Sequence, residues 1–409
     1  MPPKQSHSWT FRSRFKRDAF GWRSQPAIAR IREAVSEIKK VGQKDKVLAA
    51  EGAVIFLERL SPAIQHVDSS SGAIGIAVNN AIDTLVPIIA GAPANEELRS
   101  NWLERLWEAV EADNIPYLEL LADHWGTLCA TTAHAAHWAD SFLPVLRLAW
   151  GPDHSLRGYF KGTTACLSAL YKSARHEEIL ELLELAPYKI WPYRCWGVKA
   201  LAALDRKADA IEYAEKERDI NDSPFAIARA CEEILLSSGL VDQAYSLYAF
   251  DANRKATYLA TFRAVCSKYP HKTQKEVLED LVASSPGDRG KWFAAAKSAG
   301  LYDEAIALAN SDPCDPRTLI RAARDCIAVE PRFALEAGMA ALRWMAAGYG
   351  YDVELLDVRS AYDHTIAAAR QAGCETGTVE RIRNLVMERP SDSNLVFIAL
   401  GRNLGLGAK

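Results

Sequence analysis

The chain has 409 residues, of which 49% are hydrophobic and 25% are charged. This composition indicates a soluble folded protein and excludes a disordered chain. The chain is longer than one ordinary globular domain, but a repeat array can reach this length without separate cores. The net charge is −3, yet residues 1–40 carry ten Lys/Arg and three acids (+7), so residues 41–409 carry −10. A basic segment on an acidic body is the asymmetry that bears most on partners.

Membrane and export signals are weak. The longest apolar stretch, residues 77–92, is interrupted by polar residues and a proline, and a membrane span needs ~18–20 apolar residues. The first residues lack the apolar core of a signal peptide. The eight cysteines are scattered singly without a CxxC pair, which is typical of reduced thiols in the cytosol. We therefore expect a cytoplasmic protein with no membrane partner.

Residues 1–25 are predicted to form an N-terminal arm in which aromatic and basic side chains alternate. This alternation suits base stacking and phosphate neutralisation, so nucleic acid is one candidate partner. The same residues could equally pin an extended segment to the acidic body through aromatic packing and salt bridges. The candidate partner-binding residues of the arm are Arg12, Arg14, Lys16, Arg17, Trp22 and Arg23.

Residues 26–154 are predicted to form a helical region. One helix begins near Pro26, and a second is expected to stop at Ser61-Pro62. Asp68 or a following serine is expected to cap the helix after Gly72. Apolar spacing predicts helices over residues 26–40, 46–60, 95–110 and 117–129.

His124, Cys129, His134 and His137 form the one set of potential metal ligands. His134 and His137 would share a helix face. Their spacing matches no known zinc motif, and no further Cys pair supports a site. We therefore expect structural histidines packed beside tryptophans, with no metal and no cofactor.

Residues 155–312 are predicted to be an array of helix pairs. The turn sequence Gly239-Leu240-Val241-Asp242-Gln243-Ala244 recurs as Gly300-Leu301-Tyr302-Asp303-Glu304-Ala305, and more weakly at residues 204–211 and 173–179. The equivalent positions are Glu178, Ala210, Ala244 and Ala305, which are separated by 32, 34 and 61 residues. The last interval contains one degenerate helix pair. Ala210 and Ala244 are expected to be buried where neighbouring helices meet. The predicted pairs are 156–171 with 177–185, 193–204 with 208–218, 225–238 with 241–249, 258–269 with 275–283, and 291–299 with 303–310.

The spacing of this array resembles the tetratricopeptide superfamily, which implies an α-solenoid of stacked helix–turn–helix pairs. The helices predicted in residues 313–409 are expected to cap the array. The sequence departs from the superfamily at the Trp and Gly positions of the first helices and at the proline that ends each unit.

The whole chain also resembles an uncharacterised bacterial family of all-helical proteins. That resemblance implies a helical solenoid and supplies no catalytic residues. The stretches that carry it are residues 9–15, 19–26, 66–72, 291–297, 314–319 and 348–351.

No nucleophile elbow, zinc-protease motif, Walker loop or dinucleotide fingerprint is present in the sequence. We therefore expect a non-catalytic scaffold that binds a protein in a bacterial complex. The alternatives are nucleic-acid binding through the arm and an enzyme with an unrecognised site. The candidate partner-binding residues of the array are Trp196, Arg229, Arg263 and Trp292.

Overall fold

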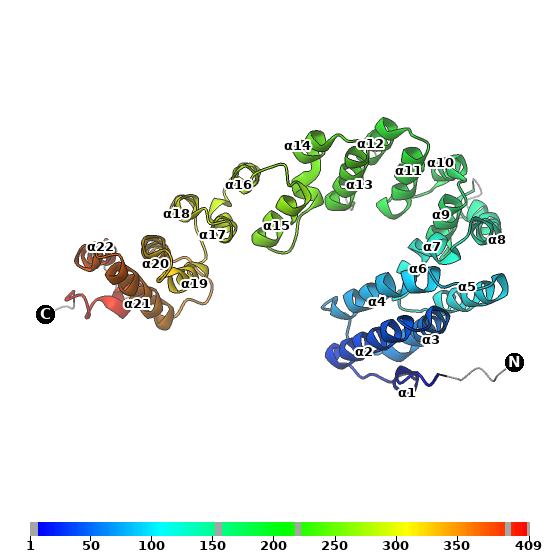
Figure 1. Ribbon diagram of the computed structural model, residues 1–409, viewed down its shortest axis with the longest axis horizontal. Coiled ribbons are helices and arrows are strands. Elements are labelled where there is room, and N and C mark those ends of the chain that lie inside the picture. Colours follow the sequence, from blue (N-terminus) through cyan, green and yellow to red (C-terminus); the bar gives the residue numbers. More distant parts are fainter. Residues whose placement is uncertain (1–6, 152–157, 217–221, 389–393, 407–409) are drawn as a thin grey trace. The chain divides into compact units, whose positions relative to one another are not determined.

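The computed structural model describes residues 7–151, 158–216, 222–388 and 394–406. The all-α prediction is confirmed, since these residues form helices joined by turns and contain no strand (Figure 1). Contacts divide the chain into two compact units, Met1–Ile234 and Leu235–Lys409. Neither boundary predicted for the array, at residue 154 or 312, coincides with that division. The tetratricopeptide-like arrangement and the division into four regions stay predictions.

Unit 1 begins with a short helix and three long ones, and α13 contains the boundary with unit 2. The helices are α1 (Phe11–Arg14), α2 (Ser24–Gly42), α3 (Lys46–Ile64), α4 (Ala73–Ala90), α5 (Glu96–Glu111), α6 (Leu120–Asp123), α7 (Trp125–Cys129), α8 (Thr132–Trp150), α9 (Thr163–Lys172), α10 (His176–Leu185), α11 (Trp191–Ala203), α12 (Lys207–Lys216) and α13 (Pro224–Ser237).

Unit 2 contains the remaining helices and one short 3₁₀ turn, η1. They are α14 (Val241–Ala252), α15 (Tyr258–Lys268), α16 (Gln274–Ala283), η1 (Arg289–Trp292), α17 (Phe293–Ser298), α18 (Tyr302–Ser311), α19 (Pro316–Cys326), α20 (Pro331–Ala346), α21 (Leu355–Gln371), α22 (Glu375–Met387) and α23 (Leu395–Leu400).

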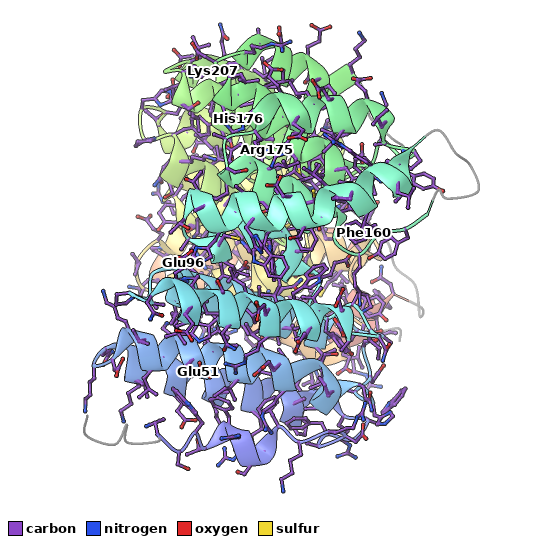
Figure 2. The ribbon with its side chains drawn as sticks, turned by 90° about the vertical axis from the view of Figure 1, so that its right-hand side faces the viewer. Glu51, Glu96, Phe160, Arg175, His176 and Lys207 are labelled. Carbon is purple, nitrogen blue, oxygen red and sulfur yellow. The ribbon has the colours of Figure 1, made fainter. Side chains whose placement is uncertain are left out.

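Helices α2, α3 and α4 form a three-helix bundle in unit 1, and they lie side by side in Figure 1. The short loops reverse the chain twice, so α2 and α4 run parallel. On α2, Ile28, Ile31 and Ile38 recur at helical spacing and are buried. Helix α5 packs on α3, and Glu51 of α3 accepts hydrogen bonds from α5. Figure 2 shows the layer of Glu51 beside the layer that begins at Glu96.

The prediction that Ser61-Pro62 ends α3 is wrong, because the helix continues to Ile64. Proline removes one backbone donor from a helix. Tertiary contacts stabilise the turn that follows: the carbonyls of Pro62 and Ala63 accept hydrogen bonds from the backbone N–H groups of Asp18 and Phe20. The arm therefore supports the last turn of α3.

One further local expectation is corrected. Residues 117–129 do not form one helix, since the chain breaks at His124 between α6 and α7. The N-cap of α4 is Gly72 in the left-handed conformation (φ 70°), and the N–H of Ala73, the first residue of the helix, donates to the Ser71 hydroxyl at 3.4 Å. Asp68 instead accepts a hydrogen bond from the backbone N–H of Ser70, 3.0 Å away, which closes a local turn.

The recurring turn sequence has one backbone geometry at all four positions. The second residue after the end of each first helix is left-handed, with φ of 60° at Ala174, 61° at Asp205, 75° at Gly239 and 73° at Gly300. In each turn the next N–H donates to the carbonyl five residues earlier, as Leu240 does to Leu235 at 3.0 Å. This is the Schellman arrangement, which satisfies the last helical carbonyls. The structure confirms the turns at both glycine and non-glycine positions.

Candidate functional site

A groove of about 700 Å³ lies between the parallel helices α2 and α4. Its lining extends along α2 from Gln25 to Gln43, which is about 27 Å at the rise of an α-helix. The groove is deep on the α4 side because the side chains there are small: Ala73, Ala77 and Ala81 recur every fourth residue. The full lining is Gln25, Ile28, Ile31, Arg32, Val35, Ser36, Lys39, Lys40, Gln43, Ala73, Ile76, Ala77, Asn80, Ala81 and Thr84.

The groove is basic. Arg32, Lys39 and Lys40 are exposed along its α2 edge, and its lining contains no Asp or Glu. Within the described residues these three cations form no ion pair. Elsewhere on α2, Arg30 does pair with Glu33, at 2.6 Å. The groove cations are therefore available to pair with a ligand.

The groove also presents apolar surface. The side chain of Ile76 is 63% exposed, and Val35 is half-buried. Helix α4 as a whole has the length and apolar composition of a membrane span. Most of its other large apolar side chains, including Val78, Ile82 and Ile89, are buried in the core of unit 1, and Ile88 is partly buried against that core. Ile76 is the large aliphatic side chain of α4 that packing leaves uncovered.

The predicted arm, over the residues described, is docked on α2 and α3. Trp9, Phe11 and Phe15 are buried, and Phe11 and Phe15 pack edge-on against Phe56 of α3 with ring centroids 5.5 and 5.0 Å away. The indole of Trp9 fills the space over Gly52, where a Cβ atom would approach the ring too closely to fit. The aromatic packing expected for a pinned arm is therefore observed, although residues 11–14 form the short helix α1 and are not extended. Nucleic-acid binding by the arm stays a prediction.

Polar contacts fix the same segment. The backbone N–H of Thr10 donates to Glu37 at 2.9 Å, and the Arg14 guanidinium pairs with Glu33 at 2.6 Å. Arg30 and Arg14 hold the pKa of the Glu33 carboxyl below its usual range, through hydrogen bonds and charge attraction. The acids that receive the arm lie on the face of α2 that packs on α1, whereas the groove faces α4.

Other charged and aromatic groups of the arm point to solvent. The side chain of Trp22 is 72% exposed. Arg14 is engaged with Glu33, but the remaining arm cations form no ion pair within the described residues. These exposed cations are Arg12, Lys16, Arg17 and Arg23.

The four candidates of the array separate into two kinds. Trp196 and Trp292 are each only 4% exposed, so they are core residues and not surface residues available to a partner. The ring of Trp196 lies 5.9 Å from Tyr171, and Lys199 caps its face at 3.9 Å. Arg229 and Arg263 are exposed, in different units. Arg263 donates to the hydroxyl of Ser298 at 2.9 Å.

A second hollow, of about 540 Å³, lies within unit 2 between α14, α15 and η1. At its wall the Tyr258 hydroxyl and the Lys291 ammonium both donate to Asp288, each at 2.7 Å. The bond from Lys291, and then that from Tyr258, holds the pKa of Asp288 low, while burial raises the pKa of Tyr258. Trp292 donates to Ser285 at 2.8 Å. These polar groups satisfy one another.

The four residues considered as potential metal ligands do not converge on one site. His124 faces Asp83 at 3.2 Å, and His134 Nδ1 lies 2.7 Å from the Thr131 hydroxyl. Among the described residues no three His, Cys, Asp or Glu side chains are grouped as a metal site. Cys129 is a buried thiol whose pKa is raised to about 12 by burial.

Comparison with models of known protein families gives no match, and comparison with curated proteins gives none. The groove is the feature that the sequence reasoning missed. In the sequence, Arg32, Lys39 and Lys40 counted only toward the positive charge of residues 1–40. A usable signal was present: these cations occupy one side of a helix, and Asn79 and Asn80 follow Ile76 by three and four residues, which places them on the same helix face.

Proposed function

We propose that this chain is a non-catalytic helical scaffold that binds a protein partner, and that the groove between α2 and α4 is the surface it uses. The observation that carries the proposal is a row of unpaired cations along an apolar hollow, at Arg32, Lys39 and Lys40. Specific interfaces combine an apolar centre with a polar rim, and charge complementarity selects the partner. A bacterial, cytoplasmic complex is the setting we propose, and the cysteines scattered singly along the sequence without a CxxC pair support the cytoplasmic part.

The test is co-purification of the full chain from cells that naturally express it, at physiological salt. We expect a stoichiometric protein partner that is lost with Ile76→Glu. The matched control is Leu148→Glu on α8, since Leu148 is 54% exposed against 63% for Ile76. A chain that elutes alone, or a partner retained equally by both variants, would count against the proposal.

Nucleic acid binding by the arm is a second candidate. Trp22 is exposed, and Arg12, Lys16, Arg17 and Arg23 surround it in the sequence without ion pairs in the described chain. Removing residues 1–25 would be a poor test, because it would strip Trp9, Phe11 and Phe15 from the core. Changing the four cations to glutamine leaves those rings in place.

The measurement is binding to generic DNA and RNA at low and moderate salt. A phosphate-binding arm predicts a steep salt dependence that the four-glutamine variant loses. Equal binding by the variant, or none by the parent at low salt, would remove this candidate.

A further inference from the structure

We infer that the occupant of the α2/α4 groove is an acidic amphipathic helix of a protein partner, lying along α2 as an added helix of the bundle. This inference rests on the proposed function and names the chemistry of the partner. Its evidence is the shape of the bundle, the floor of the groove and the positions of its cations.

The bundle has three sides, and two of them are covered. The arm and α1 pack on the side of α2 and α3, and α5 packs on α3 while α6 and α7 pack on α4. The third side, between α2 and α4, is hollow, and its lining covers about 27 Å along α2 and about 17 Å along α4. Two parallel helices offer ridges and a groove that receive a helix of about 18 residues.

The floor of the groove suits an apolar helix face. Ala73, Ala77 and Ala81 let a visiting backbone approach α4 closely, while Val35 and Ile76 form the walls. Ile76 is exposed in the unbound chain and would be covered by that face. A visiting helix needs apolar residues at helical spacing to use this floor, which makes it amphipathic.

The cations set the charge of the partner. Arg32 and Lys39 are seven residues apart on α2, about 10.5 Å along its axis. Covering them with an apolar surface alone would leave charges partly desolvated and unpaired, which is costly. Acidic residues seven positions apart on a neighbouring helix match the same spacing. The rim would then pair with two turns of the partner.

The experiment is a selection on the full chain. A displayed library of about 18-residue helices, with its surface positions randomised, is enriched on the parent and depleted on Ile76→Glu. We expect binders that carry acids seven residues apart on an amphipathic helix. Their affinity should fall about tenfold or more with Arg32→Glu/Lys39→Glu, since opposed charges become like charges. Binding should be unchanged with Leu148→Glu.

A charge swap adds a readout that misfolding cannot mimic. Replacing the acids of a selected peptide with lysine should restore binding to Arg32→Glu/Lys39→Glu and abolish binding to the parent. The inference is overturned if no helix is enriched, if enriched helices lack acids, or if they bind Ile76→Glu equally well.

Two results would assign the groove to a different ligand and so overturn the inference. Binding of phosphatidylglycerol vesicles that depends on Ile76, without any selected helix, would assign the groove to an anionic membrane surface. Self-association of the chain that Ile76→Glu abolishes would assign it to a second copy. If selection fails but a stoichiometric partner is still lost with Ile76→Glu, the scaffold proposal stands and only the helix is wrong. If both fail, both are wrong.

Discussion

Arg194 and Asp222 form an ion pair, 2.8 Å between Nη1 and Oδ2, with side chains only 1% and 4% exposed. The same guanidinium donates to the carbonyls of Tyr213 and Ala214 at the end of α12, and Asp222 also accepts the backbone N–H of Trp191. One buried pair therefore joins α11, the end of α12 and the segment before α13. All of these residues lie in unit 1.

Arg194→Met should lower the free energy of unfolding by about 3–5 kcal/mol, because it leaves the Asp222 carboxylate buried without its cation. The matched control is Arg206→Met, whose partner Asp209 is half exposed and whose loss should cost at most about 1 kcal/mol. Urea denaturation followed by circular dichroism measures both. Equal losses would show that the buried pair does not hold these helices together.

The left-handed turn residues predict opposite effects of two substitutions. Ala174→Gly should stabilise unit 1 by roughly 0.5–1 kcal/mol, because an L-residue at φ 60° is strained and glycine is not. Gly239→Ala should destabilise by about 1 kcal/mol from backbone strain alone, since a Cβ atom there meets nothing within 4 Å. Thermal melts of the two variants would refute the shared geometry if both moved the same way.

Ala210 is fully buried on α12, whereas Ala208, two residues earlier, is exposed. Ala210→Arg should destabilise by several kcal/mol through overpacking and burial of a charge. Ala208→Arg should stay within about 0.5 kcal/mol of the parent. Ala244, the equivalent position of unit 2, is also fully buried and predicts the same loss. A parent-like melt for Ala210→Arg would mean that this helix interface is misplaced.

Gly52 tests the docking of the arm. Gly52→Ala places a methyl group against the indole of Trp9 and should release the arm, because the contact would be far shorter than van der Waals distance. Trypsin should then cleave after Arg12, Lys16 or Arg17 several times faster. The control is Gly75→Ala on α4, where a Cβ atom meets nothing within 4 Å. Unchanged cleavage with Gly52→Ala would contradict the docked arrangement.

Periodicity and turn chemistry predicted most helices to within a few residues. Val241 begins α14 as expected, because Gly239 forces the turn before it. Pro62 shows where local rules failed: the arm donates hydrogen bonds to the carbonyls of the last turn of α3, and no local pattern encodes them. The burial of Trp9 and Phe15 was equally non-local, since it depends on Gly52 and Phe56 of another helix.

The candidate site was less predictable than the fold. Arg32 and Lys39 read as ordinary solvated charges in sequence, and Ile76 as one more apolar residue of α4. Their juxtaposition depends on how α2 and α4 pack, which apolar spacing does not specify. Trp196 and Trp292 illustrate the converse, since large aromatic residues proposed for a surface are covered by neighbouring side chains.

Photo-crosslinking from the groove is the most direct measurement of the central claim. In cells that naturally express the protein, Ile76→p-benzoylphenylalanine should give one dominant adduct with another protein, joined through an acidic helical segment identified by mass spectrometry. Leu148→p-benzoylphenylalanine, at a similarly exposed site on α8, should not give that adduct. Equal adducts from both positions, or adducts at position 76 with lipid or with this chain alone, would contradict the claim.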